Sequence, residues 1–313
     1  MSGLTLASHL AGRGHEVTVF EKARGPGGRM STRREGDLEF DHGAQYFTVG
    51  DDRFAEAVVE WEKQVIVQPW RARVVGLDQR RVTTPPREKM RYVAVHRMNA
   101  ICRHLAAPLD VKLRMPVKSA RRHEGGWRLI DSDDRPCGQF GLLAITIPPE
   151  QAIAFLGDAP EVTERVRAAR MAPCWAVMAA FERSLGADWD AAFVSRSPLS
   201  WIARNSSKPG RPAGEMWVMH ASPEWSLEHL ELGPEAVVER LTDALFDATG
   251  MEHVRAELAR PHRWRYARAE NAITDGCIWV PSLGLGVCGD WCRGSRVEDA
   301  FLSGLLLADY ISR

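Results

Sequence analysis

The chain has 313 residues, with 41 Lys and Arg against 41 Asp and Glu, and hydrophobic residues make up 45% of it. Such a balance is typical of a soluble globular protein with one large domain or two intergrown ones, and it favours neither nucleic acid nor a membrane as a partner. No apolar run reaches the roughly 18 residues that span a bilayer. The six scattered cysteines form no zinc pattern, and the start lacks the features of a signal peptide, so we expect a cytoplasmic protein without a metal.

The first half of the chain alternates helices with short strands. Leu4, Leu6 and Leu10 lie near helical spacing and predict a helix over residues 3–11. The elements expected after it are a strand at 16–20, a glycine-rich loop at 25–28, a helix at 51–63, short strands between 65 and 95 that Pro85 and Pro86 interrupt, a helix at 99–106, and strands near 110–122, 126–131 and 140–147.

The second half is richer in strands. Several strands are expected between residues 173 and 222, then a helix at 234–249, a strand at 285–288 and a helix from about Ser295 to the end. The two ends of the chain thus resemble an α/β fold, and the middle is mainly strand. We expect a discontinuous Rossmann-like domain, with a sheet-rich substrate domain inserted into it. The expected bounds are 1–70, 100–150 and 270–313 for the first domain, and 71–99 and 151–269 for the second.

The opening residues carry part of a dinucleotide-binding signal. Such a site needs a first strand, a glycine-rich turn, a helix N-terminus facing the pyrophosphate, and an acid that binds the ribose at the end of the second strand. Glu21 follows Gly3 at close to the roughly 20-residue spacing of such sites. The first strand and first two glycines are absent, which would leave a slot at the sheet centre. Either this is a plain helix and strand with a surface Glu, or the chain begins at an internal methionine of a longer protein.

Four short motifs extend the signal beyond the opening residues. They are Gly27-Gly28-Arg29-Met30, Asp41–Phe47, Cys288–Trp291 and Arg296–Ala300. Their ordered series resembles the flavoprotein family that includes the amine oxidases, and within that family it is most similar to the bacterial renalases. The resemblance continues through residues 201–211, 220–226 and 262–268, so it covers nearly the whole chain. It implies that FAD is the cofactor.

The resemblance also implies which residues hold FAD. Gly28 lets the backbone approach a ligand closely, and Arg29 can then make a charge-assisted contact with the pyrophosphate or the flavin edge. Asp290 would bind the ribityl chain or lie near the pyrophosphate. A helix starting near Arg296 and Val297 would direct its positive end at the flavin and stabilise the negative charge of the reduced ring. The remaining cofactor residues implied are Ser2, Gly3, Glu21 and Lys22 for the ADP half, Val117 for adenine, and Gly43, Ala44 and Gln45 for the isoalloxazine ring.

Candidate catalytic residues come from the motif Asp41–Phe47 and from the inserted region. They are Tyr46, Trp201, Arg204, Asn205 and His220. Aromatic rings can wall a flat substrate, and the amide and guanidinium groups can orient it. His220 could equally be a hydrogen-bonded core histidine, and the tryptophans could be structural. Residues 96–99 read His-Arg-Met-Asn where the family tends to have Pro-Gly-Met-Ser, so the resemblance is weaker there.

By resemblance to the renalases, the enzyme would oxidise the 2-dihydro and 6-dihydro isomers of NAD(P)H to NAD(P)+. Hydride would go to flavin N5, and O2 would be reduced to H2O2. No serine triad, carboxylate pair or metal cluster stands out, which suits this chemistry because a dihydropyridine donates hydride without a general base. Two alternatives stay open, namely a flavin amine oxidase and a degenerate protein that no longer binds flavin. The expected partners are a small-molecule substrate and O2, without nucleic acid or membrane.

Overall fold

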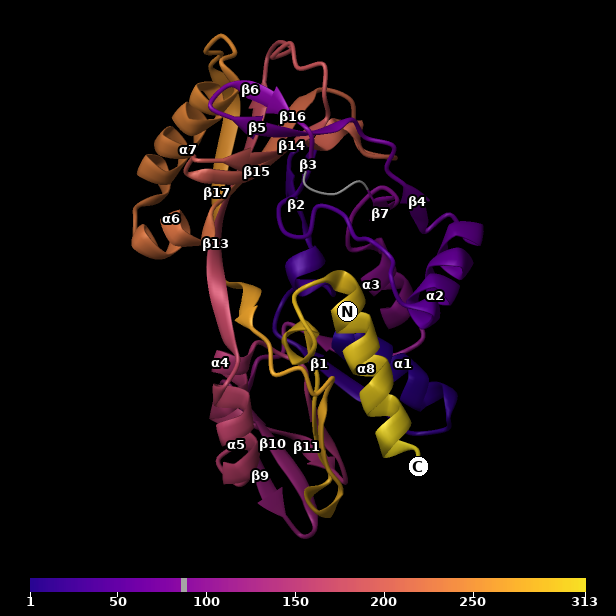
Figure 1. Cartoon of the computed structure of the whole chain (residues 1–313). Coiled ribbons are helices and arrows are strands. Elements are labelled where there is room, and N and C mark those ends of the chain that lie inside the picture. Colours follow the sequence, from indigo (N-terminus) through magenta and orange to yellow (C-terminus); the bar gives the residue numbers. More distant parts are fainter. Residues whose placement is uncertain (86–88) are drawn as a thin grey trace.

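Residues 1–85 and 89–313 are described by a computed structural model of the chain, which has an upper part built on a large sheet and a lower part that contains both chain ends (Figure 1). Of the two prolines expected to interrupt the strands of residues 65–95, Pro86 lies outside the described residues. Within the described residues, no helix has both the length and the apolar character needed to cross a membrane.

Two helices from opposite ends of the chain lie side by side in the lower part. They are α1 (Ser2–Gly12) and α8 (Val297–Ile311). Gly304 makes this contact possible, because a Cβ at that position would lie 2.3 Å from the carbonyl oxygen of Ser2. The first turn of α1 is thereby fixed against α8, and the two ends form one unit.

The parallel strands beneath these helices form two separate sheets. In one, β1 (Thr18–Glu21) pairs with β8 (Asp110–Leu113) in parallel. In the other, β19 (Leu285–Val287) pairs with β12 (Leu143–Ile145) in parallel and with β18 (Ile278–Val280) antiparallel. No strand joins the two sheets within the described part of the chain. This division agrees with the slot expected from the opening residues.

An antiparallel sheet and two short helices complete the lower part. The strands are β9 (Val117–His123), β10 (Gly126–Asp131) and β11 (Pro136–Phe140), and the helices are α4 (Pro149–Ala152) and α5 (Pro160–Arg167). Both helices begin with proline, whose fixed φ suits a first helical position. They pack with the β9–β11 sheet around Trp127 and Leu156. The domain bounds remain a prediction, although this packing ties residues beyond 150 to the lower part.

The upper part is a seven-stranded sheet covered on one side by helices (Figure 1). Trp217, Ile202 and Leu241 lie in its core. Leu241 belongs to the longer of the two covering helices, α7 (Pro234–Thr249). That helix begins at a proline, and Gly250 follows its last residue as a left-handed cap with a φ of 70°. The strands in order are β17 (Ala256–Asn271), β13 (Arg170–Phe181), β16 (Glu215–Ala221), β15 (Leu199–Arg204), β14 (Ala191–Ser195), β5 (Val74–Asp78) and β6 (Arg81–Thr83), and the helices are α6 (Pro223–Glu228) and α7 (Pro234–Thr249).

Strand β13 connects the two parts. Met171 near its start packs in the lower core, and Phe181 at its end packs in the upper core. Its neighbour β17 runs antiparallel to it along nearly the whole length. The two strands therefore fix the upper sheet relative to the lower part, and the candidate site lies beside them.

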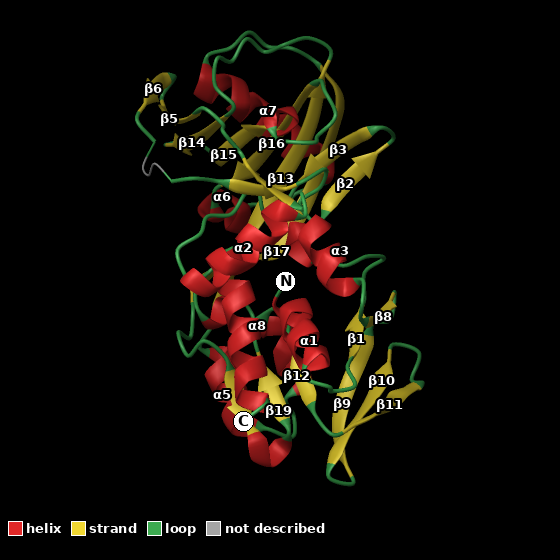
Figure 2. Cartoon of the chain, turned by 90° about the vertical axis from the view of Figure 1, so that its right-hand side faces the viewer, coloured by secondary structure: helices red, strands yellow, loops and turns green. Residues whose placement is uncertain are grey.

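The expected helices of the first half are present with small shifts. They are α2 (Asp52–Lys63) and α3 (Ala100–Ala106). Asp51 caps α2 by accepting a hydrogen bond from the Arg53 amide at 3.0 Å. The expected strand at 140–147 shrinks to the three residues of β12. A hairpin that the sequence did not predict, β2 (Thr32–Glu35) and β3 (Leu38–Asp41), lies between the upper sheet and α3 (Figure 2), and β4 (Val67–Pro69) pairs with β7 (Tyr92–Ala94) nearby.

Candidate active site

Residues 41–47, which we call the hub segment, follow the end of β3 and contact all three regions that carry predicted site residues. The amide of Ala44 donates to the Arg29 carbonyl at 2.8 Å. The Asp41 amide donates to Asn205 Oδ1 at 3.2 Å, and His220 Nε2 lies 3.1 Å from the His42 carbonyl oxygen. The hub segment therefore brings together residues from the first 50 positions and from the strands of the upper sheet.

Arg29 and Asp290 join the hub segment to the C-terminal region. The guanidinium of Arg29 binds both carboxylate oxygens of Asp290, at 2.8 and 2.6 Å, in a fork geometry. Asp290 starts the short helix η5 (Asp290–Cys292) just after β19. Gly43 must be glycine, because a Cβ there would lie 2.0 Å from the Arg29 carbonyl oxygen. Gly43, Arg29 and Asp290 are thus neighbours in space, and their roles toward FAD stay a prediction.

On one side of the hub segment lies a buried group that we call the ion cluster. It consists of Asp41, Gln45, Asn205, Lys208 and Arg211. The ammonium of Lys208 donates to Asp41 at 3.3 Å, to Gln45 at 3.1 Å and to Asn205 at 3.2 Å. The guanidinium of Arg211 binds the same Asp41 oxygen at 2.7 Å. The side chains of Asp41, Lys208 and Arg211 are at most 1% exposed.

The ion cluster keeps its charges although it is buried. Burial acts to raise the pKa of Asp41, but the charges of Lys208 and Arg211 lower it to about 2. Burial lowers the pKa of Lys208 to about 8, against the opposing pull of Asp41. At neutral pH one carboxylate therefore faces two cations. A net positive charge is held directly behind the hub segment.

On the other side of the hub segment lies the histidine cluster of His42, His220, His262 and Trp264. The indole of Trp264 donates to the His42 carbonyl at 3.0 Å and stacks on the His42 ring, with 5.0 Å between centroids. Burial lowers the pKa of His42 to about 3, and it lowers those of His220 and His262 to about 4. The three imidazoles are neutral at pH 7. Within the described residues they form no group able to hold a metal ion.

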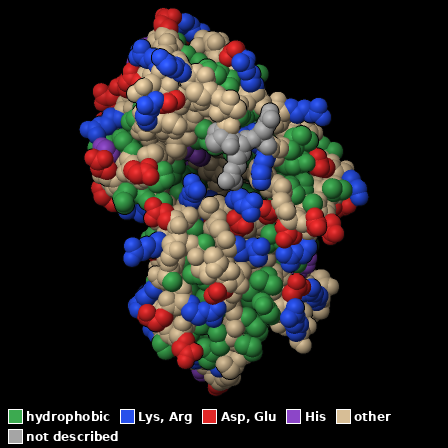
Figure 3. All heavy atoms as spheres, viewed as in Figure 1, with side chains coloured by type: hydrophobic (Ala, Val, Ile, Leu, Met, Phe, Trp, Pro, Cys, Tyr) green, Lys and Arg blue, Asp and Glu red, His purple; other side chains and the backbone are tan. Residues whose placement is uncertain are grey.

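An aromatic group surrounds Tyr46 at the far end of the hub segment. The Tyr46 ring lies 5.3 Å from Trp201 and 6.2 Å from Trp70, and Phe193 lies 4.7 Å from Trp201. The indole N–H of Trp70 donates to Ser207 at 3.2 Å. The indole N–H of Trp201 is buried and has no hydrogen-bond partner in the described part of the chain. Between the upper and lower parts the molecular surface is hollowed, with a histidine visible inside and Lys or Arg side chains at the rim (Figure 3).

Other predicted residues lie apart from the hub segment. The guanidinium of Arg204 pairs with Asp190 at 2.6 Å, so a role in the site would require that pair to open. Glu21 ends β1, and its carbonyl accepts the amide of Met115 at 3.0 Å, two residues before Val117. Glu21 and Val117 thus belong to one neighbourhood, and their roles toward ADP stay a prediction. Lys22 next to Glu21 is exposed, and Ser2 and Gly3 form the first turn of α1.

The two helices expected to face the cofactor begin differently. α1 has no acidic residue in its first turn and no side-chain cap. α8, which starts after Arg296 at Val297, has two buried acids in its first turn. Asp299 accepts the Arg296 amide at 3.0 Å, and Glu298 accepts the amide of Gly50 at 2.6 Å. The positive end of α8 is thus partly neutralised by its own residues, whereas that of α1 is not.

Several residues of the site lie within the motifs, but the sequence assigned them no role. They are Asp41, His42, Lys208, Arg211 and His262. The only available signal was their charge or ring next to small residues inside the motifs. Their partners lie far along the chain, since Asp41 and Lys208 are 167 positions apart, and one sequence does not reveal such pairs.

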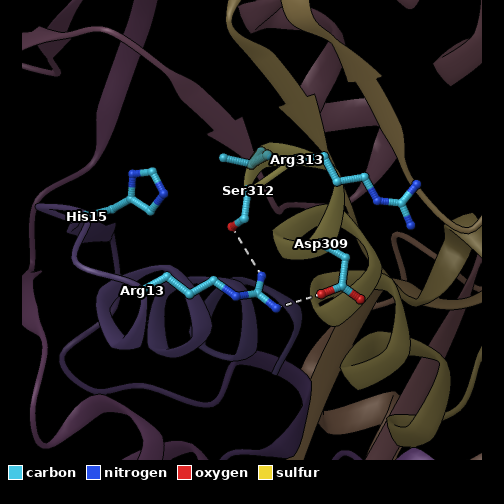
Figure 4. Close-up of a pocket in the computed structure, with 6 residues that line it drawn as sticks. Arg13, His15, Asp309, Ser312 and Arg313 are labelled. Carbon is cyan, nitrogen blue, oxygen red and sulfur yellow. Dashed lines mark hydrogen bonds and ion pairs between the residues drawn. The ribbon is translucent and has the colours of Figure 1, made fainter.

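The described residues also line surface cavities. One of about 630 Å³ lies where α1 and α8 end, lined by Arg13, His15 and Ser312 among others, and the Arg13–Asp309 ion pair closes one side of it (Figure 4). None of its lining residues belongs to the candidate site. The second, of about 790 Å³, is lined by residues of α3 and by Arg211, so it shares a wall with the ion cluster.

Comparisons with known proteins agree with this architecture. Residues 1–60 match the family model of an NAD(P)-binding Rossmann-like domain. A putative protoporphyrinogen oxidase from Exiguobacterium sp. 255-15 superposes with a TM-score of 0.77 at 13% identity, over 99% of this chain and 96% of that one. Putrescine oxidase bound to putrescine gives 0.73 at 12% identity, over 100% and 97%. These likenesses establish the fold, and they confirm the predicted Rossmann-like domain with a large sheet domain.

One curated protein is similar in sequence over a short stretch. It is the 4,4'-diapophytoene desaturase (4,4'-diaponeurosporene-forming) of Staphylococcus haemolyticus (strain JCSC1435), which is 38% identical over 72 residues. The match covers 22% of this chain and 14% of the desaturase. The similarity is therefore confined to a small part of both proteins.

Proposed function

We propose that the chain is an FAD-dependent oxidoreductase, and that its substrates are the 2-dihydro and 6-dihydro isomers of NAD(P)H implied by its resemblance to the bacterial renalases. The observation that carries the proposal is the hub segment. Residues expected to hold the cofactor or the substrate meet around residues 41–47: Arg29 and its ion-pair partner Asp290 on one side, and Asn205 after a strand of the upper sheet on the other. The Rossmann-like match over residues 1–60 supports the dinucleotide half of the proposal.

The residues present fit such a cofactor. The uncapped first turn of α1, free of acids, suits a pyrophosphate, and Glu21 stands at the end of β1 for the ribose. Beside Tyr46, the buried indole N–H of Trp201 is available to an acceptor on a bound molecule. When bound, FAD would accept a hydride from the substrate and pass the electrons to O2, so that dihydro-NAD(P) isomer, O2 and H+ give NAD(P)+ and H2O2.

The chain's own contribution would be electrostatic and steric. The ion cluster holds a net positive charge behind Gly43 to Gln45, which stabilises negative charge that develops next to these residues. The histidine cluster adds no charge at pH 7 because its imidazoles are neutral. Tyr46 and Trp201 offer flat faces against which a nicotinamide ring can stack, and they exclude water from it.

The alternative is a flavin amine oxidase. A protonated amine would be repelled by the net positive charge of the ion cluster, whereas a neutral dihydropyridine ring would not. The ion cluster therefore favours the dihydropyridine as the substrate.

The test is a spectrum followed by an anaerobic titration. We expect purified protein to carry flavin absorbance, and we expect the 2-dihydro or 6-dihydro isomer to bleach it, with the ordinary 1,4-dihydro isomer as the matched control. Bleaching by a primary amine alone would establish the amine oxidase instead. Colourless protein that FAD cannot reconstitute would mean that the chain is not a flavoenzyme.

A further inference from the structure

The second cavity has a basic lining. We call it the Arg103 groove, and its polar lining consists of Glu39, His96, Arg97, Asn99, Arg103 and Arg211. Three arginines and one acidic residue thus line the groove. Arg97 pairs with Glu39, and Arg211 pairs with Asp41 behind the wall. Arg103 is exposed on α3, and its guanidinium makes no ion pair within the described residues. The groove therefore offers a cation to an anionic ligand.

The wall opposite α3 is held in an uncommon backbone conformation. His96 has a φ of 63° and Gly210 a φ of 73°. A Cβ on Gly210 would lie 2.8 Å from the His96 nitrogen, so the two loops pack backbone to backbone. Residues other than glycine rarely adopt a positive φ, so the conformation of His96 is the uncommon one. Such conformations recur at ligand sites. Asn99, on the α3 side as the residue that precedes this helix, has a buried side-chain carbonyl oxygen without a hydrogen-bond partner in the described part of the chain.

The groove and the hub segment are adjacent. Arg211 lines the groove, and its guanidinium binds Asp41 at 2.7 Å and the Ala94 carbonyl at 2.5 Å. Glu39 also lines the groove, and its carbonyl accepts the side-chain amide of Asn205 at 2.8 Å. Strand β3 and Arg211 thus separate the two. A ligand with one group at the hub segment can place a second group in the groove only if it is extended.

We propose that the Arg103 groove binds the diphosphate of a dinucleotide substrate. Guanidinium groups match phosphate oxygens in pairs of hydrogen bonds. Arg103 can supply such a pair, and the paired Arg97 and Arg211 add positive charge beside it. The inference rests on the proposed function, because it assigns the anionic half of the same substrate. A diphosphate could also come from FAD, but the residues implied for the cofactor's diphosphate are Arg29 and the first turn of α1. The experiment therefore uses FAD-loaded protein.

The variant is Arg103→Glu, and the matched control is Arg240→Glu, an exposed arginine on the distant helix α7. We expect Arg103→Glu to raise KM for the dihydro-NAD isomer roughly tenfold or more, because the variant loses a charge-assisted contact with the phosphates. The matching dihydronicotinamide riboside, which has no phosphate, should keep its kcat/KM. Calorimetry with ADP-ribose should show weaker binding to Arg103→Glu by a similar factor, and Arg240→Glu should behave as wild type in all three assays.

Three results would overturn the inference. Equal changes for the dinucleotide and the riboside would mean that Arg103 does not read the phosphates. Loss of FAD from Arg103→Glu, with Arg240→Glu retaining it, would assign the groove to the cofactor. Unchanged ADP-ribose binding would exclude the groove as a diphosphate site. If no dihydro isomer bleaches the wild-type flavin, the proposed function fails, and the ADP-ribose titration still decides whether the groove binds a diphosphate.

Discussion

Asp41 and His42 are consecutive residues, yet their side chains lie in opposite electrostatic surroundings. Successive side chains at a strand end point to opposite faces. Asp41 is charged and bound by Lys208 and Arg211. His42 is neutral, packed against Trp264 and His262, and its Nδ1 has no partner within the described residues. A single peptide bond thus separates a charged, ion-paired site from an uncharged aromatic one.

The difference shows what decides whether a buried ionisable group keeps its charge. Both residues are almost completely buried. Desolvation opposes charge in each case, but only Asp41 has opposite charges within hydrogen-bond distance to offset it. His42 has other imidazoles as neighbours, which would repel a proton on it. The hub segment can therefore present a positive field on one side and an uncharged wall on the other.

Removing the charge of Asp41 is expected to have the largest effect. Asp41→Asn would leave Lys208 and Arg211 buried without a counter-charge, which costs about 3–5 kcal/mol in the free energy of unfolding. Urea denaturation measures this. The control is Asp110→Asn, whose exposed carboxylate pairs with Lys112 at 2.8 Å, and there we expect at most about 1 kcal/mol. Equal losses in the two variants would mean that the ion cluster does not depend on its carboxylate.

Acid should weaken the histidine side. The pKa of His42 is about 3 in the folded chain and close to 6.5 when unfolded, so the unfolded state binds more protons below pH 6.5. Stability is then complete above pH 6.5 and falls as the pH drops toward 3. At pH 5 the loss from His42 alone is roughly 2 kcal/mol relative to pH 7.

The matched measurement compares urea unfolding of wild type and His42→Gln at pH 7 and pH 5. The variant has no imidazole to protonate at that position, so its stability should change less between the two pH values. Carboxylates are common to both proteins, and the low pKa of Asp41 places its own contribution below pH 4. A difference between pH 7 and pH 5 as large in His42→Gln as in wild type would falsify the neutral assignment of this imidazole.

Sequence patterns predicted elements whose local signals are strong. α7 and α8 have apolar spacing of helical period, and Asp51 is a cap residue placed before α2. β2 and β17 were not predicted, because their side chains are half-buried or polar on both faces and show no alternation. β17 exists because it pairs with β13 along its length, and such long-range pairing is not written in the local pattern.

The candidate site likewise has a part that the sequence indicated and a part that it did not. Motifs with glycine and small residues indicated the hub segment, because Gly43 answers a local steric need that a sequence can display. The ion cluster needed Asp41 to meet Arg211 across 170 positions of chain. Arg204 lies in the same motif as Arg211 and was predicted to be a site residue, yet its guanidinium pairs with Asp190. The turn after β15 therefore decides that Arg211, and not Arg204, faces the hub segment.

The smallest expected effect separates two indoles that both lie near Tyr46. Trp201→Phe and Trp70→Phe remove similar volume, so their packing losses should nearly cancel in a comparison. Trp70 also loses its hydrogen bond to Ser207, worth about 1 kcal/mol, whereas the buried N–H of Trp201 has no partner to lose within the described residues. Trp70→Phe should therefore lower the free energy of unfolding of FAD-free protein more than Trp201→Phe.

In FAD-loaded protein the order should reverse if the Trp201 N–H donates to a bound ring, and thermal unfolding with and without FAD measures both. A greater loss for Trp201→Phe without FAD would show that this N–H is already satisfied inside the folded chain, and it would then be unavailable to a ligand.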